Sequence, residues 1–236
     1  MQKIADYIFD LSPKKLAVYL ILGPLVLFLC SCDNNPKSKL FSQNFEKSKA
    51  KNELEVISLD SVMSFSELRE MMGKIACKRK VSGLKFEDND TIYHILGFSS
   101  CPTSSEIACY FRRNLLTIKN DSLIIGRGKE KNKKPIKYLK TELENIISKP
   151  YNFQHNKDKL KPALIYLYIE DKHTISITKK VLKEIAKQFQ NINPVHKPDF
   201  FNYTILFKGF DITNVPPPPP PIPPPPIKPN EIELEE

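Results

Sequence analysis

The sequence predicts an α+β fold: a mixed sheet in the order β-β-α-β-α-β, with two helices on one face. Three observations lead to this prediction. From residue 115 onward, short β-prone runs alternate with stretches whose apolar residues recur at helical spacing. Prolines and polar turns separate these runs. The 236-residue chain is 41% hydrophobic, which is enough for an ordinary core once an apolar leader and a proline-rich tail are set aside.

The elements of this domain follow one another between residues 113 and 210. Two β-prone runs, at 115–119 and 122–126, flank Asn120-Asp121 and predict a hairpin. After a basic loop at 127–134, helical spacing predicts a helix over 136–147. The remaining predictions are a strand at 163–169, a helix capped by Thr178 and ended by Pro194 and Pro198, and a strand at 203–207. The apolar face of this second helix would comprise Val181, Leu182, Ile185 and Phe189.

The part of the chain before residue 113 is predicted to contain less structure. Residues 33–57 are rich in Lys, Ser, Asn and Glu and are expected to form a disordered tether. Residues 58–112 are expected to form a small region of helix and strand. There, Ser64 and Glu67 match a capping box ahead of an apolar helical stripe, and residues 91–96 predict a strand.

The leader at residues 1–32 indicates export. Its 14 uncharged residues, 16–29, follow Lys14-Lys15 and are short of the ~20 that span a bilayer. The next residues, Leu29-Cys30-Ser31-Cys32, resemble the lipobox of bacterial lipoproteins. That resemblance implies that Cys32 is lipidated and becomes the first residue of the mature protein. The alternative is an uncleaved signal anchor, and both interpretations place the rest of the chain in the cell envelope, facing the periplasm.

The reactive side chains do not form a catalytic or metal-binding pattern. Three cysteines follow the leader, and a disulfide between Cys101 and Cys109 is expected because they lie eight residues apart in an oxidising compartment. Cys77 would then be a packed thiol. The four histidines are scattered, and no metal-ligand spacing or nucleophile motif occurs. We therefore expect no enzyme activity, no cofactor and no metal.

Residues 115–208 resemble the periplasmic domain of the ExbD/TolR family of biopolymer-transport proteins. The resemblance rests on the hairpin at 116–126, on the strand at 164–169 with its acidic-basic end Glu170-Asp171-Lys172, and on the helix at 177–189. It implies the fold given above, homodimerisation, and partners such as an ExbB/TonB-like complex. The family's transmembrane aspartate has no counterpart in residues 16–29, so this chain is not expected to couple proton flow.

Positive charge is concentrated between the leader and the tail. The chain carries a net charge of +9, and its densest basic run lies at 127–134. Export makes nucleic acid an unsuitable partner. The run is expected either to contact an anionic surface or to form a solvated loop; its basic residues are Arg127, Lys129, Lys131, Lys133 and Lys134.

The tail at 211–236 contains a proline-rich run with an acidic end. Fourteen residues, 216–229, are expected to form a polyproline II rod of roughly 43 Å. This run resembles the spacer of TonB-type energy transducers, and it would bind a partner through residues including Pro216, Pro221, Ile222, Pro226 and Ile227. Two functions follow. One is a non-enzymatic lipoprotein that is an accessory of a TonB/ExbD- or Tol-like transport assembly. The other is an envelope adaptor or spacer without a transport role.

Overall fold

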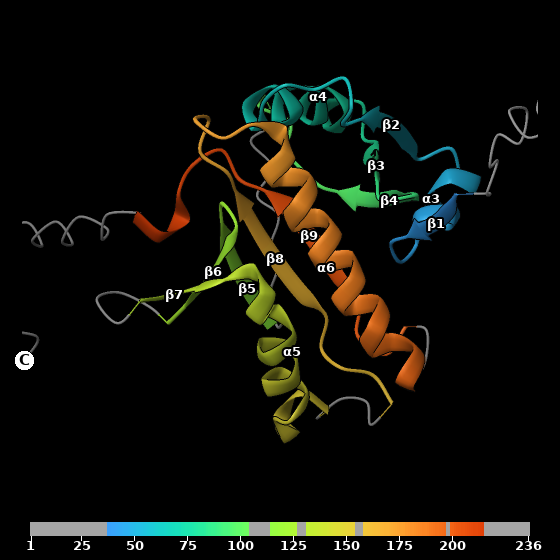
Figure 1. Cartoon of the computed structure of the whole chain (residues 1–236). Helices are drawn as coiled ribbons and strands as arrows, with labels where there is room; N and C mark the ends of the chain where they lie inside the picture. Colours follow the sequence, from blue (N-terminus) through green and yellow to red (C-terminus); the bar gives the residue numbers. More distant parts are fainter. Residues whose placement is uncertain (1–36, 104–113, 127–130, 154–157, 197–198, 215–236) are drawn as a thin grey trace, which may run out of the picture. The chain divides into compact units, whose positions relative to one another are not determined.

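The fold is α+β, as predicted, with two mixed sheets. The computed structural model describes residues 37–103, 114–126, 131–153, 158–196 and 199–214 (Figure 1). The four-stranded sheet has the order β1-β4-β3-β2 and the five-stranded sheet the order β7-β6-β5-β8-β9. The strands of the first are β1 (Ser38–Phe41), β2 (Leu54–Ser58), β3 (Val81–Asp88) and β4 (Thr91–Gly97). Those of the second are β5 (Asn114–Lys119), β6 (Ser122–Ile125), β7 (Asn132–Pro135), β8 (Ala163–Tyr168) and β9 (Tyr203–Phe207).

The five-stranded sheet places its helices on one face. In the described residues its helices are α5 (Leu139–Ile147) and α6 (Ile175–His196), which contact one another and lie in front of the strands in Figure 1. Strand β8 is parallel to both β5 and β9, so Ile165 and Leu167 project from the same face as Ile118. All three side chains are fully buried. Apart from one additional strand, β7, the order of strands and helices along this part of the chain is the predicted one.

The hairpin forms at the predicted place although its turn lacks glycine. Asn120 adopts a left-handed conformation with φ 55°, which asparagine tolerates better than most residues. Its side-chain Oδ1 also accepts a hydrogen bond from the Glu170 N–H at 2.9 Å. The asparagine therefore both closes the turn and ties it to Glu170, the second residue after β8.

The basic run contains a strand that the sequence did not predict. Asn132–Pro135 forms β7, which pairs antiparallel with β6 at the edge of the sheet. A strand rich in lysine is common at an edge, because its charges oppose pairing with another chain. The following helix begins as a 3₁₀ turn at Ile136–Tyr138 before it continues as α5.

Helix α6 is longer than the sequence predicts. It begins at Ile175, three residues before the expected cap Thr178, whose side chain is fully buried within the helix. The helix continues past Pro194 to His196. A proline so close to a helix end removes one backbone hydrogen bond without stopping the last turn.

The expected tether is largely structured. Residues 38–58 form β1, the short helix α3 (Phe45–Ala50) and β2, which corrects the prediction of disorder over 33–57. The segment folds because its few apolar side chains are well placed: Leu40, Phe45 and Ile57 are all buried. The Phe45 ring lies over Gly83, where an added Cβ would approach it to 3.0 Å.

Helix α4 (Phe65–Cys77) forms after the predicted cap. The Ser64 hydroxyl accepts a hydrogen bond from the Glu67 N–H at 3.1 Å. The reciprocal bond of the capping box is shifted by one residue, since the Glu67 carboxylate accepts from the Met63 N–H at 2.8 Å. Leu68 and Met72 are fully buried, as the helical stripe predicts.

The two sheets share one hydrophobic core. Phe98, just after β4, exchanges two backbone hydrogen bonds of 2.9 Å with β9, to Ile205 O and from the Phe207 N–H. The Phe207 ring stacks on Phe65 of α4 at 5.6 Å between centroids. The described residues on both sides of the predicted domain boundary at residue 113 therefore contribute to the same core.

Replacing Phe189 with alanine should strongly destabilise the protein. Phe189 is 1% exposed on α6 and contacts the rings of Phe201 and Tyr203. Phe189→Ala is expected to cost about 3–5 kcal/mol of unfolding free energy, measured by denaturant unfolding. The control Lys187→Ala changes an exposed residue of the same helix. Equal stability of the two variants would contradict this packing.

Candidate functional site

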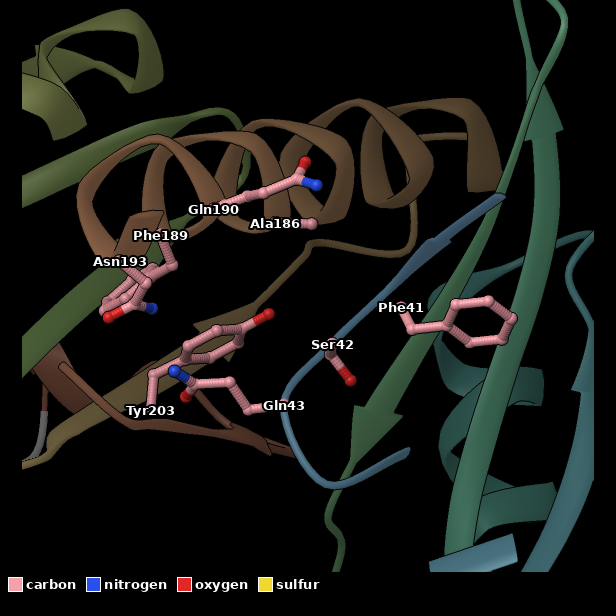
Figure 2. Close-up of a pocket in the computed structure, with 8 residues that line it drawn as sticks. All are labelled: Phe41, Ser42, Gln43, Ala186, Phe189, Gln190, Asn193 and Tyr203. Atoms are coloured by element: carbon pink, nitrogen blue, oxygen red, sulfur yellow. The ribbon is translucent and has the colours of Figure 1, made fainter. Parts of the chain in front are cut away.

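A groove lies beside the second half of α6. It has a volume of about 280 Å³. In Figure 2 the Gln43 side chain lies beside the Tyr203 ring across from α6, while the Phe41 ring points away from both. The lining residues are Phe41, Ser42, Gln43, Ala186, Phe189, Gln190, Asn193 and Tyr203. Small-molecule sites usually measure roughly 300–1,000 Å³, so this groove suits a few side chains better than a large cofactor.

Asn193 holds the floor of the groove by hydrogen bonding to the backbone. Its Oδ1 accepts from the Phe201 N–H at 2.8 Å, and its Nδ2 donates to the Phe201 carbonyl at 3.3 Å. Gln43 Nε2 donates to the same carbonyl, also at 3.3 Å. Asn193 of α6 and Gln43 after β1 thus both bind the backbone of Phe201, two residues before β9 begins.

Ser42 joins the other wall of the groove to β4. Its N–H donates to the His94 carbonyl at 2.7 Å, and its Oγ accepts from the Leu96 N–H at 2.9 Å. Asn44, with φ 63°, then turns the chain sharply into α3. The walls of the groove are therefore held by hydrogen bonds to backbone groups of β4 and of Phe201.

A second cavity of about 240 Å³ adjoins the first. It shares Ser42, Gln43 and Tyr203 with the first groove and extends toward α3 and the end of β4. Its other lining residues are Asn44, Ser48, Leu96, Phe98 and Thr204. The two hollows flank one short segment of chain, an arrangement that suits an extended ligand.

The chemistry of this groove is that of binding. Its lining contains no carboxylate, histidine, lysine or cysteine. Burial raises the pKa of the Tyr203 hydroxyl, which therefore stays protonated at neutral pH and acts as a hydrogen-bond donor. Amide groups and one phenol amid apolar side chains can orient a ligand, but they supply no general base.

An ion-pair network fixes the chain after β9. Lys119 Nζ lies 2.8 Å from Asp211 and 3.0 Å from Glu170. Lys172, Lys119 and Asn120 together lower the pKa of Glu170 to about 2. The two carboxylates correspondingly raise the pKa of Lys119. This network holds the segment from which the proline-rich tail continues.

The disulfide differs from the expected one. Cys101 is bonded to Cys77, with a Cα–Cα distance of 4.7 Å, rather than to Cys109. The ends of α4 and of the segment after β4 meet because Gly73 leaves room for Pro102, which lies 3.2 Å from where a Cβ would stand. Spacing along the sequence could not reveal this contact. Cys109 lies outside the described residues.

The predicted anionic-surface residues are only partly described. Lys131, Lys133 and Lys134 lie at or next to β7, where Lys131 donates a hydrogen bond to the Thr213 carbonyl. Lys133 is exposed and Lys134 half-buried. Arg127 and Lys129 fall outside the described residues, as do Cys32 and the tail residues Pro216, Pro221, Ile222, Pro226 and Ile227. Their roles remain predictions.

Two comparisons with known proteins find no match for this chain. Neither the models of known families nor the curated proteins match this chain. Within the described ranges, no helix has the length and apolar character needed to cross a bilayer. The same residues contain no group of three or more His, Cys, Asp or Glu side chains arranged to hold a metal ion.

The sequence did not indicate the groove. Gln43 and Ser42 lie in the predicted tether, and Asn193 follows the apolar stripe that defined α6. The available signal was Phe41, Phe45 and Leu40, three large apolar residues within a polar stretch. Leu40 and Phe45 are the buried residues of a short strand and a short helix, not of a linker.

Removing the Asn193 amide should loosen the groove floor. Asn193→Ala leaves the Phe201 N–H without its acceptor and is expected to cost about 1–3 kcal/mol of unfolding free energy. Thermal and denaturant unfolding measure the loss. Gln190→Ala, one turn earlier and exposed, is the matched control and should change stability by less than about 0.5 kcal/mol. A loss of the same size in both variants would refute the role of Asn193.

Proposed function

We propose that this protein is a non-enzymatic lipoprotein of the cell envelope. Its folded domain binds an extended segment of a partner in the groove beside α6, as an accessory of a TonB/ExbD- or Tol-like transport assembly. The observation that carries the export part of this proposal is the Cys77–Cys101 disulfide. Stable disulfides belong to oxidising compartments, which agrees with the lipobox-like residues that end in Cys32.

The binding part of the proposal is supported by the groove. Its apolar side chains and amide groups suit the side chains and backbone of an extended peptide, and its lining lacks groups for acid-base catalysis. The assembly part is supported by the order of elements, which, apart from the added strand β7, is the one the ExbD/TolR resemblance implies. An adaptor or spacer remains the second candidate function, favoured by the polyproline tail.

Lipidation is tested by mass. The purified membrane form should begin at Cys32 and carry acyl chains, and Cys32→Ala should accumulate as an unprocessed precursor. A mature chain that begins at Met1 with an unmodified Cys32 would refute lipidation and favour the signal anchor.

The disulfide should be formed in the exported protein and should stabilise it. Cys77→Ser with Cys101→Ser is expected to cost about 3–4 kcal/mol, the chain-entropy value for a loop of this size, because the bonded residues are 24 apart. Thermal unfolding with and without reductant measures this. Cys109→Ser is the matched control and should not change the loss of thermal stability that reductant causes. Sensitivity to reductant that depends on Cys109 would contradict the pairing.

Partner binding is tested by site-specific crosslinking in the full chain. A photoreactive residue at Gln190, on the groove, should trap a defined envelope protein. The control position Lys187, exposed on the same helix, should not. Recovery of a motor or transducer component would support the transport role. Recovery of the protein alone, or the same adducts at both positions, would overturn binding in the groove.

A further inference from the structure

The four-stranded sheet has an outer face, covered in part by Phe45 of α3, that combines lysines with exposed apolar side chains. Its core face carries Leu84, Phe86 and Ile95, which are fully buried. The opposite face is set by register: Lys85 of β3 pairs with His94 of β4. We call this opposite side the outer face.

Strand β1 extends the outer face. Leu40 points into the core, so Lys39 and Phe41 project to the other side. The Phe41 ring stacks on His94 at 4.6 Å between centroids, with the planes only 14° apart. Phe45 of α3 contacts the same imidazole edge-on at 5.2 Å. The outer face therefore contains a cluster of three rings, in which Phe41 stacks on His94 and Phe45 meets it edge-on.

The exposed apolar side chains of this face lie on its two edge strands, and Lys85 lies between them on β3. Phe41 on β1 is 41% exposed, and Val56 on β2, separated from β1 by β4 and β3, is 53% exposed. Burial lowers the pKa of His94, and the nearby Lys85, Lys39 and Lys49 lower it further against the opposing effect of Glu46, so the imidazole is uncharged at neutral pH.

The charge of the face is positive on balance. Residues 39–51 contain four lysines and a single acidic residue, Glu46, a net charge of +3. Lys85 is exposed on the face, and Glu87 follows it two residues later on β3. Exposed lysines around an exposed aromatic ring are the features that bind a protein to an anionic membrane surface.

The distance from the proposed lipid anchor is short. Only seven peptide units separate Cys32 from Lys39. A fully extended chain gains at most ~3.6 Å per residue, so the lipidated residue and the start of the outer face lie no more than about 25 Å apart. The sequence alone suggested a 25-residue tether, which would have allowed the domain to stand far from the membrane.

We propose that the outer face formed by Lys39, Phe41, Lys49, Val56 and Lys85 lies against an anionic phospholipid bilayer. This inference rests on the proposed lipidation of Cys32, which brings the face to the membrane. The lipid chains supply one membrane attachment and the lysines with Phe41 supply the second. Because Phe41 also borders the groove beside α6, this orientation places that groove next to the membrane contact.

The chain contains no tryptophan, so a single one can report on this contact. Phe41→Trp places the reporter on the outer face, and Phe210→Trp places it at a residue that is 57% exposed after β9. The full-length lipoprotein is purified, its acyl chains are verified by intact mass, and it is reconstituted in phosphatidylcholine vesicles with or without phosphatidylglycerol. Lipids brominated near the glycerol then quench tryptophan that touches the bilayer.

The expected result is stronger quenching and a blue-shifted emission for Phe41→Trp, by at least about twofold over Phe210→Trp, in phosphatidylglycerol vesicles. Adding Lys39→Glu and Lys49→Glu should reduce this quenching, and 0.5 M salt should act in the same direction. The control pair is Lys149→Glu, just after α5, with Lys187→Glu on α6. It makes the same change in charge and should leave quenching unchanged.

The outcomes separate the two proposals. If intact mass finds no acyl chains, the lipoprotein proposal fails and the membrane orientation fails with it. If the protein is lipidated but both reporters are quenched equally or not at all, only the orientation is overturned, and a face covered by a second copy is then tested by sedimentation. Should Phe41→Trp fail to fold, Val56→Trp replaces it on the same face.

Discussion

The buried face of α6 is the interaction on which the rest of the structure depends. Val181, Leu182 and Ile185 are fully buried, and Phe189 continues the same stripe to the groove. The helix packs on the five-stranded sheet and also contacts β4 of the other sheet. At about 25 cal/mol per Å² of apolar surface, burial on this scale outweighs any single hydrogen bond in the molecule.

Lysines on the exposed side of α6 form ion pairs with both parts of the fold, before and after residue 113. Lys179 pairs with Asp60 at 2.6 Å and Lys183 pairs with Asp88, both in the part of the chain before residue 113. Lys180 pairs with Asp121 of the hairpin turn at 3.2 Å. Partly exposed pairs contribute little energy each, so their role here is to fix the position of a helix that packing already holds. This explains why the groove beside α6 has a defined shape.

The sequence predicted the elements whose side chains follow one period over their whole length. The strand from Ile165 to Tyr168 and the stripe from Val181 to Phe189 belong to this class, because one face of each is buried. The prediction of a tether was wrong because β1, α3 and β2 are short and mostly exposed. The polar composition of the segment therefore hid its few buried residues, such as Phe45. The disulfide was wrong because Cys77 and Cys101 approach only through tertiary packing.

The groove and the outer face share one short segment, and this connection gives the fold a mechanical consequence. Lys39 and Phe41 project to the outer face, whereas Ser42 and Gln43 line the groove, which Phe41 also borders. A pull on the chain before Lys39 would act first on the pairing of β1 with β4 and then on the bonds from the Ser42 N–H and to the Ser42 hydroxyl. Loss of those bonds would move Gln43 away from the Phe201 carbonyl and open one wall of the groove. If Cys32 is the anchor, as proposed above, the same short segment connects the membrane to the groove, because Gln43 follows Lys39 by only four residues.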